Sequence, residues 1–374
     1  MLSVTCTAPV NIAVIKYWGK RNEELILPLN DSISATLSTE HLCTTTTITA
    51  SPNFTENKIT LNGVEESFEN KRLLRCLSEV RRRADEHDKC RKEILKWNIH
   101  VVTENNFPTA AGLASSASGY ACLVYALACL YGIEKEELSA IARQGSGSAC
   151  RSLYSGFVQW KKGCHDNGSD SIAIQIVPET HWPEMRILIL VVNDAKKKTS
   201  STHGMSTSVK TSELLKYRVS SCVDKNIEAL TKALHDKDFE LFGKITMQDS
   251  NQFHAVCLDT YPPCVYMNDI SHSIVNVIHQ YNKVHGEIKV AYTFDAGPNA
   301  CLYLLEKDVP DVLRIINYAF PNDNVKSVEY IKGIPVDLPE SGTDFDQFET
   351  YGSNLLKYLI HTKVGEGPKR IDEQ

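Results

Sequence analysis

The sequence has no apolar run long enough to cross a lipid bilayer. Its longest, Ala121 to Ile133, falls well short of the ~20 residues that a spanning helix needs. The amino terminus, Met1 to Thr5, shows no basic region followed by an apolar one, so we expect no signal peptide. The twelve cysteines form no Cys-x-x-Cys pair, and the twelve histidines show no His-Glu-x-x-His spacing. We therefore expect a reduced, cytoplasmic protein that binds no membrane and builds no metal site from its own side chains.

An excess of positive charge is also missing, because the formal net charge is −6 at pH 7. This balance argues against a general binder of nucleic acid or of membrane surfaces. An anionic substrate would have to be held by a few local Lys and Arg residues. With 374 residues, of which 42% are hydrophobic and 23% charged, the chain is globular and long enough for two domains.

The most informative segment is the small-residue turn Pro108 to Ser118, which leads directly into the apolar stretch Tyr120 to Tyr131. Small residues allow close approach of a ligand to the backbone, and a helix that begins here directs unpaired N–H groups at an anion. Helical spacing of Leu123, Leu127 and Leu130 supports that helix, and Gly132 marks its expected end. The turn lacks the Gly-Lys-Ser/Thr of a Walker motif. It predicts a phosphate cradle, with a serine-capped core helix as the alternative.

Periodicity divides the chain into a strand-rich start, a mixed middle and an α/β second half. In the first half we expect strands before a hairpin turn at Asn62-Gly63, a helix over 72–93, a strand over 97–103 and a helix over 134–143. A domain boundary is expected near residue 184. Beyond it we expect a strand over 185–192, helices over 213–235, 239–253 and 268–285, and strands over 290–294 and 300–305. The polar tail from Gly365 to Gln374 is expected to fray.

Four further segments could carry chemistry, although each has an ordinary structural explanation. Lys16 and Lys20 in the segment 11–20 could form a solvated face, and Arg72 could be a surface residue of a charged helix. The run 145–151 could be a flexible turn, and Asp295 within 294–300 could merely start one.

Taken together, these segments resemble the mevalonate diphosphate decarboxylases of the GHMP kinase superfamily over nearly the whole chain. The resemblance rests on the runs 11–20, 27–30 with 32–34, 105–118, 145–151, 249–254 and 292–300. At three places this sequence differs from what kinases of the superfamily commonly have. They have Gly where this chain has Ala114, Asp in the loop where this chain has Arg151, and a glycine-rich motif where this chain has residues 295–299. These three departures favour the decarboxylase branch.

The resemblance implies an α+β, two-domain GHMP kinase-like fold. Residues 1–184 would form an amino-terminal, ATP-binding domain of the ribosomal-protein-S5-like βαβ type. Residues 185–374 would form a carboxy-terminal, ferredoxin-like α/β sandwich, with the active site in the cleft between the two domains. The resemblance also implies a homodimer.

The implied reaction uses ATP and Mg²⁺ to phosphorylate the tertiary hydroxyl of mevalonate 5-diphosphate, followed by loss of phosphate and carbon dioxide to give isopentenyl diphosphate. The implied catalytic residues are Asp295, Arg151 and Lys16. The implied substrate-binding residues are Asn11, Tyr17, Trp18, Gly19, Lys20, Arg72, Ser146, Gly147, Ser148, Ala149, Cys150, Arg151 and Thr202. The implied ATP-binding residues are Pro108, Ala111, Gly112, Leu113, Ala114, Ser115, Ser116 and Ser118.

Two other functions remain open at this point. A GHMP small-molecule kinase, such as a phosphomevalonate kinase, would release no carbon dioxide, and Arg151 and Asp295 argue against it. A catalytically silent nucleotide-binding relative would be expected to lose its charged site residues, which are present here. The lysine run 196–198 is more simply a solvated loop than part of the site.

Overall fold

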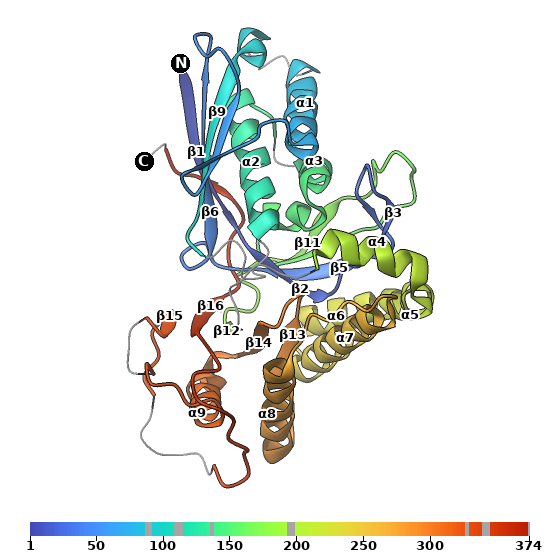
Figure 1. Ribbon diagram of the computed structural model, residues 1–374, viewed down its shortest axis with the longest axis vertical. Coiled ribbons are helices and arrows are strands. Elements are labelled where there is room, and N and C mark those ends of the chain that lie inside the picture. Colours follow the sequence, from blue (N-terminus) through green and yellow to red (C-terminus); the bar gives the residue numbers. More distant parts are fainter. Residues whose placement is uncertain are drawn as a thin grey trace.

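The computed structural model describes residues 1–86, 92–107, 115–134, 138–192, 199–325, 329–338 and 345–372. Three larger sheets and their helices follow one another along the long axis of the molecule, with the amino-terminal part at one end (Figure 1). A small hairpin of β3 (Lys20–Asn22) and β4 (Leu27–Pro28) stands beside them. This arrangement places β2 (Asn11–Ile15) and β13 (Val290–Phe294), which lie next to Lys16 and Asp295 in the sequence, near the middle of the molecule (Figure 1).

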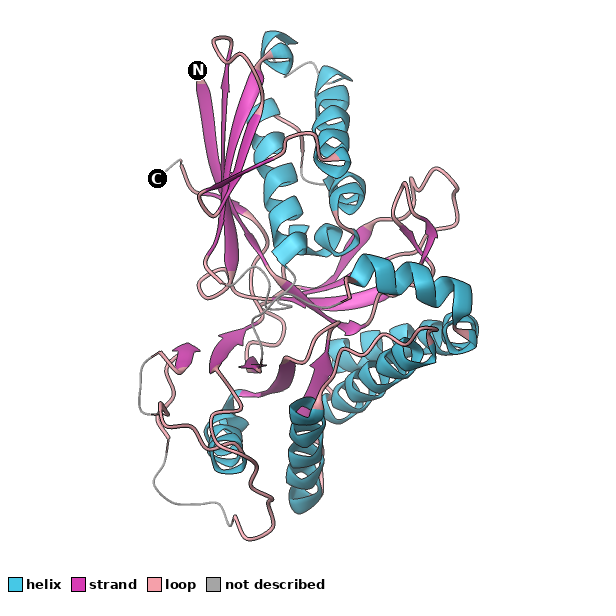
Figure 2. Ribbon diagram, viewed as in Figure 1, coloured by secondary structure: helices cyan, strands magenta, loops and turns pink. Residues whose placement is uncertain are grey.

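The first sheet forms one wall of the amino-terminal part, and helices cover one of its faces (Figure 2). Its strand order is β17 (Lys369–Arg370), β1 (Leu2–Pro9), β6 (Cys43–Ser51), β9 (Asn98–Asn105), β7 (Lys58–Leu61) and β8 (Val64–Glu66). The covering helices are α1 (Lys71–Glu86), α2 (Ser115–Tyr131) and α3 (Leu138–Gly145). Helix α2 is apolar on nearly all sides because it is buried between the sheet and the other two helices. It ends at Tyr131, and the φ of +77° at the following Gly132 fits the expected helix stop.

The middle sheet connects the two parts of the molecule. It has the order β11 (Ala173–Val177), β10 (Phe157–Trp160), β5 (Ser32–Thr36) and β2 (Asn11–Ile15). Apolar side chains such as Ile12 and Ile33 belong to the same core as Ile189 of the third sheet. The ring of Phe157 lies edge-on to Phe242, with centroids 5.8 Å apart. The middle sheet and the carboxy-terminal part therefore share one hydrophobic core, whereas the first sheet and its helices form a separate one.

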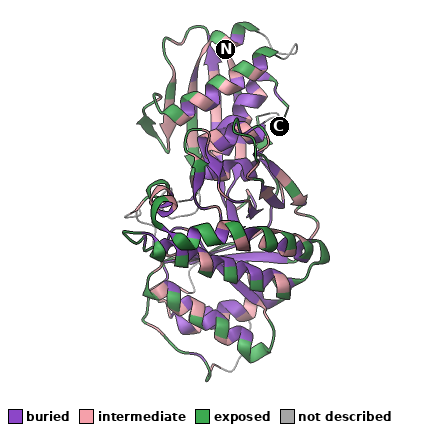
Figure 3. Cartoon of the chain, turned by 90° about the vertical axis from the view of Figure 1, so that its right-hand side faces the viewer, coloured by how far each residue is buried: buried purple, intermediate pink, exposed green. Residues whose placement is uncertain are grey.

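The third sheet forms the centre of the carboxy-terminal part. Its order is β13 (Val290–Phe294), β14 (Ala300–Leu305), β12 (Met185–Val191), β16 (Tyr358–Lys363) and β15 (Ile331–Gly333). The helices of this part are α4 (Ser201–Thr211), α5 (Glu213–Tyr217), α6 (Val223–Asp236), α7 (Phe239–Asp259), α8 (Asp269–His285) and α9 (Val309–Ala319). Figure 3 shows buried strands behind helices whose outer faces are exposed. A π-helical turn, η4 (Arg218–Cys222), joins α5 to α6.

Several expected elements are confirmed, including β13 and β14 at the predicted bounds and the hairpin turn at Asn62-Gly63. Within the range 72–93 expected to be one helix, the described residues form α1 up to Glu86, and Lys92 and Glu93 belong to a 3-10 helix, η1 (Lys92–Lys96). Helix α4 was not foreseen. Its sequence is rich in Ser and Thr, which give a weak helical pattern.

The expectation of a frayed tail is wrong for the described residues 365–372. Lys369 and Arg370 form β17, which pairs antiparallel with Thr7 and Cys6 of β1. Pairing with an edge strand satisfies backbone groups that would otherwise be left to water, so a polar sequence is ordered here. Across the described ranges, no helix combines the length and apolarity that a membrane crossing would require.

Candidate active site

A cleft opens where residues after β2 meet the first turns of α1 and α2, the 3-10 helix η3 (Gly147–Leu153) and the turn after β13. Its cavity volume is about 210 Å³. Most of the residues expected at the site line it: Asn11, Lys16, Tyr17, Trp18, Lys20, Arg72, Ser116, Ser146, Gly147, Ser148, Arg151, Thr202 and Asp295. Side chains that are distant in the sequence thus meet in one place.

Lys16 and Asp295 form an ion pair at this cleft. Lys16 Nζ lies 2.6 Å from Asp295 Oδ1 and also donates to the carbonyl of Ala13 at 2.8 Å. The lysine side chain is only 3% exposed, whereas that of Asp295 is 32% exposed. The lysine ammonium is therefore fixed by the Ala13 carbonyl and shielded from solvent, whereas the Asp295 carboxylate remains partly accessible to a ligand.

Arg151 is buried beneath the same cleft and is held by two serine hydroxyls. Its Nε donates to Ser34 Oγ at 2.9 Å and its Nη1 to Ser32 Oγ at 2.7 Å, and its guanidinium carbon lies 5.7 Å from the centre of the Trp160 ring. Burial lowers the pKa of this guanidinium from its ordinary value. No carboxylate in the described part of the chain lies within ion-pair distance of Arg151, so its charge is available to an anionic ligand.

Two further cations line the cleft, at Lys20 and Arg72. Lys20 is buried and pairs with the exposed Glu23, with Nζ 2.5 Å from Oε2. The hydroxyl of Tyr17 is buried beside them, and burial raises its pKa well above the ordinary value. The lining residues include four cations and one carboxylate, which suits a ligand that carries several negative charges.

Serine hydroxyls approach one another between α2 and η3. Ser116 Oγ lies 3.4 Å from Ser146 Oγ, which lies 3.5 Å from Ser148 Oγ. Gly147 sits between two aromatic rings, because a Cβ there would lie 2.8 Å from Trp160 Cη2 and 3.0 Å from Tyr17 Cε1. Glycine at this position lets the hydroxyl-bearing backbone lie against the rings.

Some expected site residues lie behind the cleft rather than in its lining. Cys150 and Ala149 are fully buried in apolar clusters, and the Cys150 thiol donates to the Gly147 carbonyl at 3.1 Å. Ser118 is buried and its Oγ lies 2.7 Å from Thr44 Oγ1 of β6. Gly19 has a φ of +89° and little room for a side chain. Five expected ATP-binding residues lie outside the described part of the chain: Pro108, Ala111, Gly112, Leu113 and Ala114.

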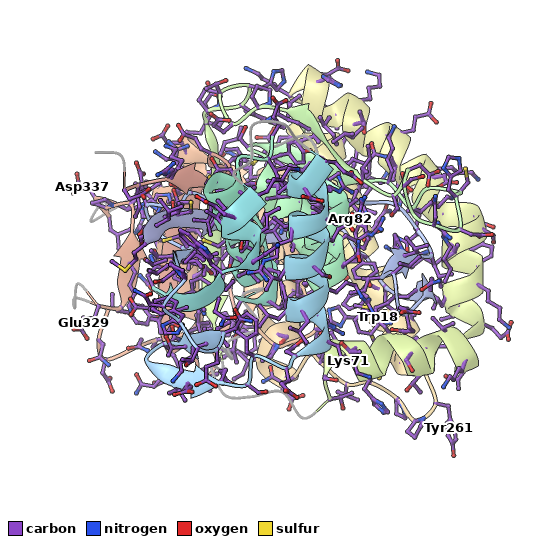
Figure 4. The ribbon with its side chains drawn as sticks, turned by 90° about the horizontal axis from the view of Figure 1, so that it is seen from above. Trp18, Lys71, Arg82, Tyr261, Glu329 and Asp337 are labelled. Carbon is purple, nitrogen blue, oxygen red and sulfur yellow. The ribbon has the colours of Figure 1, made fainter. Side chains whose placement is uncertain are left out.

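Sequence reasoning gave no role to several residues that complete the site. Ser32 and Ser34 alternate along β5 and both point at Arg151, so their spacing of two was the available signal. Met205 and Phe253 line the cleft from α4 and α7. The Phe253 ring meets Trp18 at a centroid distance of 4.9 Å, and seen from above Trp18 lies within the outline of the molecule (Figure 4). The sequence analysis connected α4 to the site through Thr202 and included Phe253 in the run 249–254, but it gave neither Met205 nor Phe253 a role.

A second, more apolar pocket adjoins the cleft between the first sheet and α2. Ser115 and Ser116, at the start of α2, line it together with Ile59, Val101 and Tyr120. Ser116 lines both pockets. A ligand with an apolar, planar end and a polar end could therefore occupy the second pocket and reach the cleft at the first turn of α2.

The α+β fold, with a cationic cleft between its two parts, defines a GHMP kinase-like enzyme. Two family models match the chain. The model described as "Diphosphomevalonate decarboxylase-like N-terminal domain" matches residues 8–173, and the model described as "Mevalonate 5-diphosphate decarboxylase C-terminal domain" matches residues 187–371. The diphosphomevalonate decarboxylase of Danio rerio is 52% identical over 376 residues, which cover 99% of this chain and 93% of that protein. The chain belongs to the mevalonate diphosphate decarboxylase family.

Solved structures agree with this assignment. The mevalonate diphosphate decarboxylase from Trypanosoma brucei has a TM-score of 0.90 and 37% identity, with 99% of this chain and 98% of that chain covered. A structure described as MDDEF in complex with MVAPP, AMPPCP and magnesium has a TM-score of 0.78 and 32% identity, with 99% of both chains covered. The resemblance and the fold class expected from the sequence are confirmed.

Proposed function

We propose that this chain catalyses the ATP-dependent decarboxylation of mevalonate 5-diphosphate to isopentenyl diphosphate, ADP, phosphate and carbon dioxide. Family membership over the full chain supports this reaction. The main observation in its favour is the environment of Arg151. Its guanidinium is buried, has no carboxylate partner among the described residues, and lies close enough to Asp295 for the carboxylate charge to oppose the lowering of its pKa by burial. Decarboxylation requires the carboxylate to be held in a fixed orientation while the phosphate leaves, and a guanidinium without an ion-pair partner suits that task.

The substrate carries a diphosphate and a carboxylate, and the site offers cations for both. Lys20, Arg72 and Tyr17, with the hydroxyls of Ser146 and Ser148, suit the diphosphate. Arg151 suits the carboxylate, because two of its nitrogens are fixed by serines and its planar fork is thereby oriented. The remaining expected substrate contacts, including Asn11 and Thr202, line the same cleft.

Asp295 is the group that meets the tertiary hydroxyl. It accepts the hydroxyl proton as the oxygen bonds to the γ-phosphorus of ATP, and Lys16 keeps its carboxylate oriented. Orientation can supply about 7–11 kcal/mol and a general base about 3–5 kcal/mol, so orientation is the larger contribution. The new phosphate then leaves with its bonding electrons, and the electrons of the carbon–carboxylate bond form the double bond as carbon dioxide departs.

The ATP phosphates are assigned to the start of α2, where Ser115 and Ser116 present hydroxyls beside a helix amino terminus. The adenosine is assigned to the second pocket, whose apolar wall includes Ile59 and Val101. Ser116 links the two pockets, so a nucleotide laid along them would direct its terminal phosphate into the cleft.

Mg²⁺ fits this arrangement because Asp295 is the only carboxylate among the described cleft residues, which leaves the ion to the ATP oxygens, water and the α2 hydroxyls. When bound, the ion neutralises charge on the phosphates during phosphoryl transfer. The MDDEF complex with MVAPP, AMPPCP and magnesium supports the use of both ATP and Mg²⁺.

We also infer a division into domains at about residue 184, a cytoplasmic location and a homodimer. The division is supported by β12, which starts the third sheet at Met185. Light scattering of the purified chain, with a mass twice the 41.8 kDa of one chain expected, tests the dimer.

One incubation tests the proposed function. The chain is mixed with ATP, Mg²⁺ and mevalonate 5-diphosphate labelled at the carboxyl carbon, and ADP, phosphate and released label are measured together. Equal amounts of the three are expected. ADP without released label would instead indicate a kinase, and neither product would indicate a silent nucleotide-binding relative.

A further inference from the structure

Within the segment Asp249 to His254 of α7, only Phe253 lines the cleft. Some of the segment's polar side chains contact the backbone at Lys16 or next to Asp295, and others contact residues that neighbour these two places. Asp249 contacts the Lys16 peptide, Ser250 and His254 contact the Phe294 peptide, Asn251 contacts the Tyr292 hydroxyl, and Gln252 contacts Arg218. One short stretch of helix thus touches both partners of the ion pair from behind.

Asp249 holds the backbone of Lys16. Its Oδ2 accepts the Lys16 peptide N–H at 2.8 Å, although the two residues come from opposite parts of the molecule. Arg218, in the π-helical turn, pairs with the same carboxylate at 2.8 Å and donates to the Lys16 carbonyl at 3.2 Å. Asn30 Nδ2 also donates to that carbonyl, at 3.0 Å. Asp249 and Arg218 are fully buried, so the peptide of Lys16 is fixed by groups that exclude water.

Ser250 and His254 hold the backbone of Phe294, the residue that precedes Asp295. The N–H of Phe294 donates to Ser250 Oγ at 3.0 Å, and the Phe294 carbonyl lies 3.3 Å from His254 Nε2. Burial lowers the pKa of His254 to about 4, with the nearby charge of Lys16 as the next cause, so the ring is neutral at pH 7 and donates through Nε2. Both backbone polar groups of Phe294 are therefore bound by the same helix.

A helix suits this task because its residues keep fixed spacings and directions. Helix α7 runs without interruption from Phe239 to Asp259, and the Asp238 side chain caps its first turn by accepting the Leu241 N–H. Catalytic groups need to be held within about 0.5 Å of their productive geometry. Two flexible side chains, Lys16 and Asp295, reach that precision only if the peptides that carry them are fixed relative to each other.

We propose that Asp249, Ser250 and His254 are positioning residues, which set the separation of Lys16 and Asp295 by fixing their backbones to one helix. The inference concerns the geometry of the pair, and its kinetic test rests on the proposed function. A merely structural role would predict that loss of these contacts lowers stability alone. A positioning role predicts lower turnover with unchanged substrate affinity.

The first test compares Ser250→Ala with Thr246→Val. Both remove a buried hydroxyl from α7, but the Thr246 hydroxyl has no hydrogen-bond partner among the described residues. We expect Ser250→Ala to lower kcat by about tenfold or more, because displacements of about 1 Å can cost about 100-fold, while KM for each substrate changes by less than about threefold. Thr246→Val should retain kcat within about twofold. Equal kcat values for the two variants, or a raised KM with unchanged kcat in Ser250→Ala, would overturn the proposal.

The second test replaces His254 and keeps the proposal falsifiable if Ser250→Ala does not fold. His254→Gln retains a side-chain N–H donor for the Phe294 carbonyl, whereas His254→Leu does not. Glutamine should preserve most of the turnover and leucine should lose about tenfold or more. The same kcat in both variants would contradict the role assigned to the hydrogen bond.

A crystal structure of Ser250→Ala tests the positioning role independently of the proposed decarboxylase function, because it requires no activity. The Lys16 Nζ to Asp295 Oδ1 separation, 2.6 Å in the native chain, should lengthen. An unchanged separation would refute the positioning role even if the chain is an active decarboxylase. Conversely, a native chain that releases no labelled carbon dioxide would refute the proposed function and leave the geometric test intact.

Discussion

Asp295 Oδ1 lies 2.6 Å from Lys16 Nζ, across the junction of the turn after β13 with the end of β2. The lysine is enclosed and the carboxylate is partly open, so the pair has one protected member and one that can meet a ligand. A ligand in the cleft can therefore contact the carboxylate while the ammonium group stays fixed behind it.

Replacement of Asp295 by asparagine should preserve binding and abolish most of the turnover. An amide cannot accept the hydroxyl proton as a carboxylate does, so kcat should fall more than about 100-fold, the lower end for a general base. Calorimetric titration with an ATP analogue and mevalonate 5-diphosphate should give near-native affinities. Asp224→Asn, at an exposed carboxylate, is the control. A turnover near that of the control would remove Asp295 from the reaction.

Arg151→Lys should reduce turnover although it keeps the positive charge. Lysine cannot donate to Ser32 and Ser34 at once while it presents a planar fork to a carboxylate. Loss of one charge-assisted hydrogen bond costs about 1.5–3 kcal/mol, which corresponds to about 10- to 100-fold in kcat/KM. Arg82→Lys, at an exposed position on α1, is the matched control (Figure 4). An unchanged kcat/KM in Arg151→Lys would show that charge alone matters there.

Gly147→Ala should raise KM for the diphosphate substrate. The added Cβ would lie 2.8 Å from Trp160 Cη2 and 3.0 Å from Tyr17 Cε1, so the rings or the serine backbone must move. Such overpacking costs about 1–3 kcal/mol in stability, which thermal unfolding measures. Gly352→Ala is the control, because its nearest contact, Leu355, lies 3.7 Å away. Equal melting temperatures and equal KM values for the two variants would contradict this account of Gly147.

His254 should make the folded chain less stable as the pH falls from about 6.5 to about 4. Its pKa is lowered to about 4 by burial and by Lys16, whereas the unfolded chain binds the proton near pH 6.5. Between these two pH values His254 is protonated in the unfolded state but not in the folded state, so the free energy of unfolding decreases by up to about 3 kcal/mol as the pH falls. Above pH 6.5 the ring is neutral in both states, and this contribution to stability is fully present. Asp295 and His272 also face the ring and have opposite effects.

Denaturant unfolding at pH 7 and at pH 4.5 measures this loss, with His254→Gln as the comparison. The glutamine variant should lose less stability between the two pH values, because it has no group there to protonate. The same loss in both proteins would exclude His254 as its source.

The sequence predicted most of the local structure and much of the site, because these rest on short-range patterns. Strands β13 and β14 have buried apolar runs bounded by turn residues. Lys16, Arg151 and Asp295 lie in sequence runs that carry the resemblance to the decarboxylase family. The contact between Asp249 and Lys16 could not be foreseen, since it joins residues 233 positions apart and depends on how the two parts dock. The π-helical turn at Arg218 also escaped prediction, because its sequence continues the helical pattern around it.

The pairing of β17 with β1 has a mechanical consequence. The chain passes from the middle sheet to the third sheet before Met185, and it returns after Lys363, where Val364 bridges to Leu37. The tail therefore joins the two parts of the molecule a second time, in addition to the apolar core that the middle and third sheets share. Cutting the chain after Lys363 would remove this second connection while leaving every described cleft residue in place.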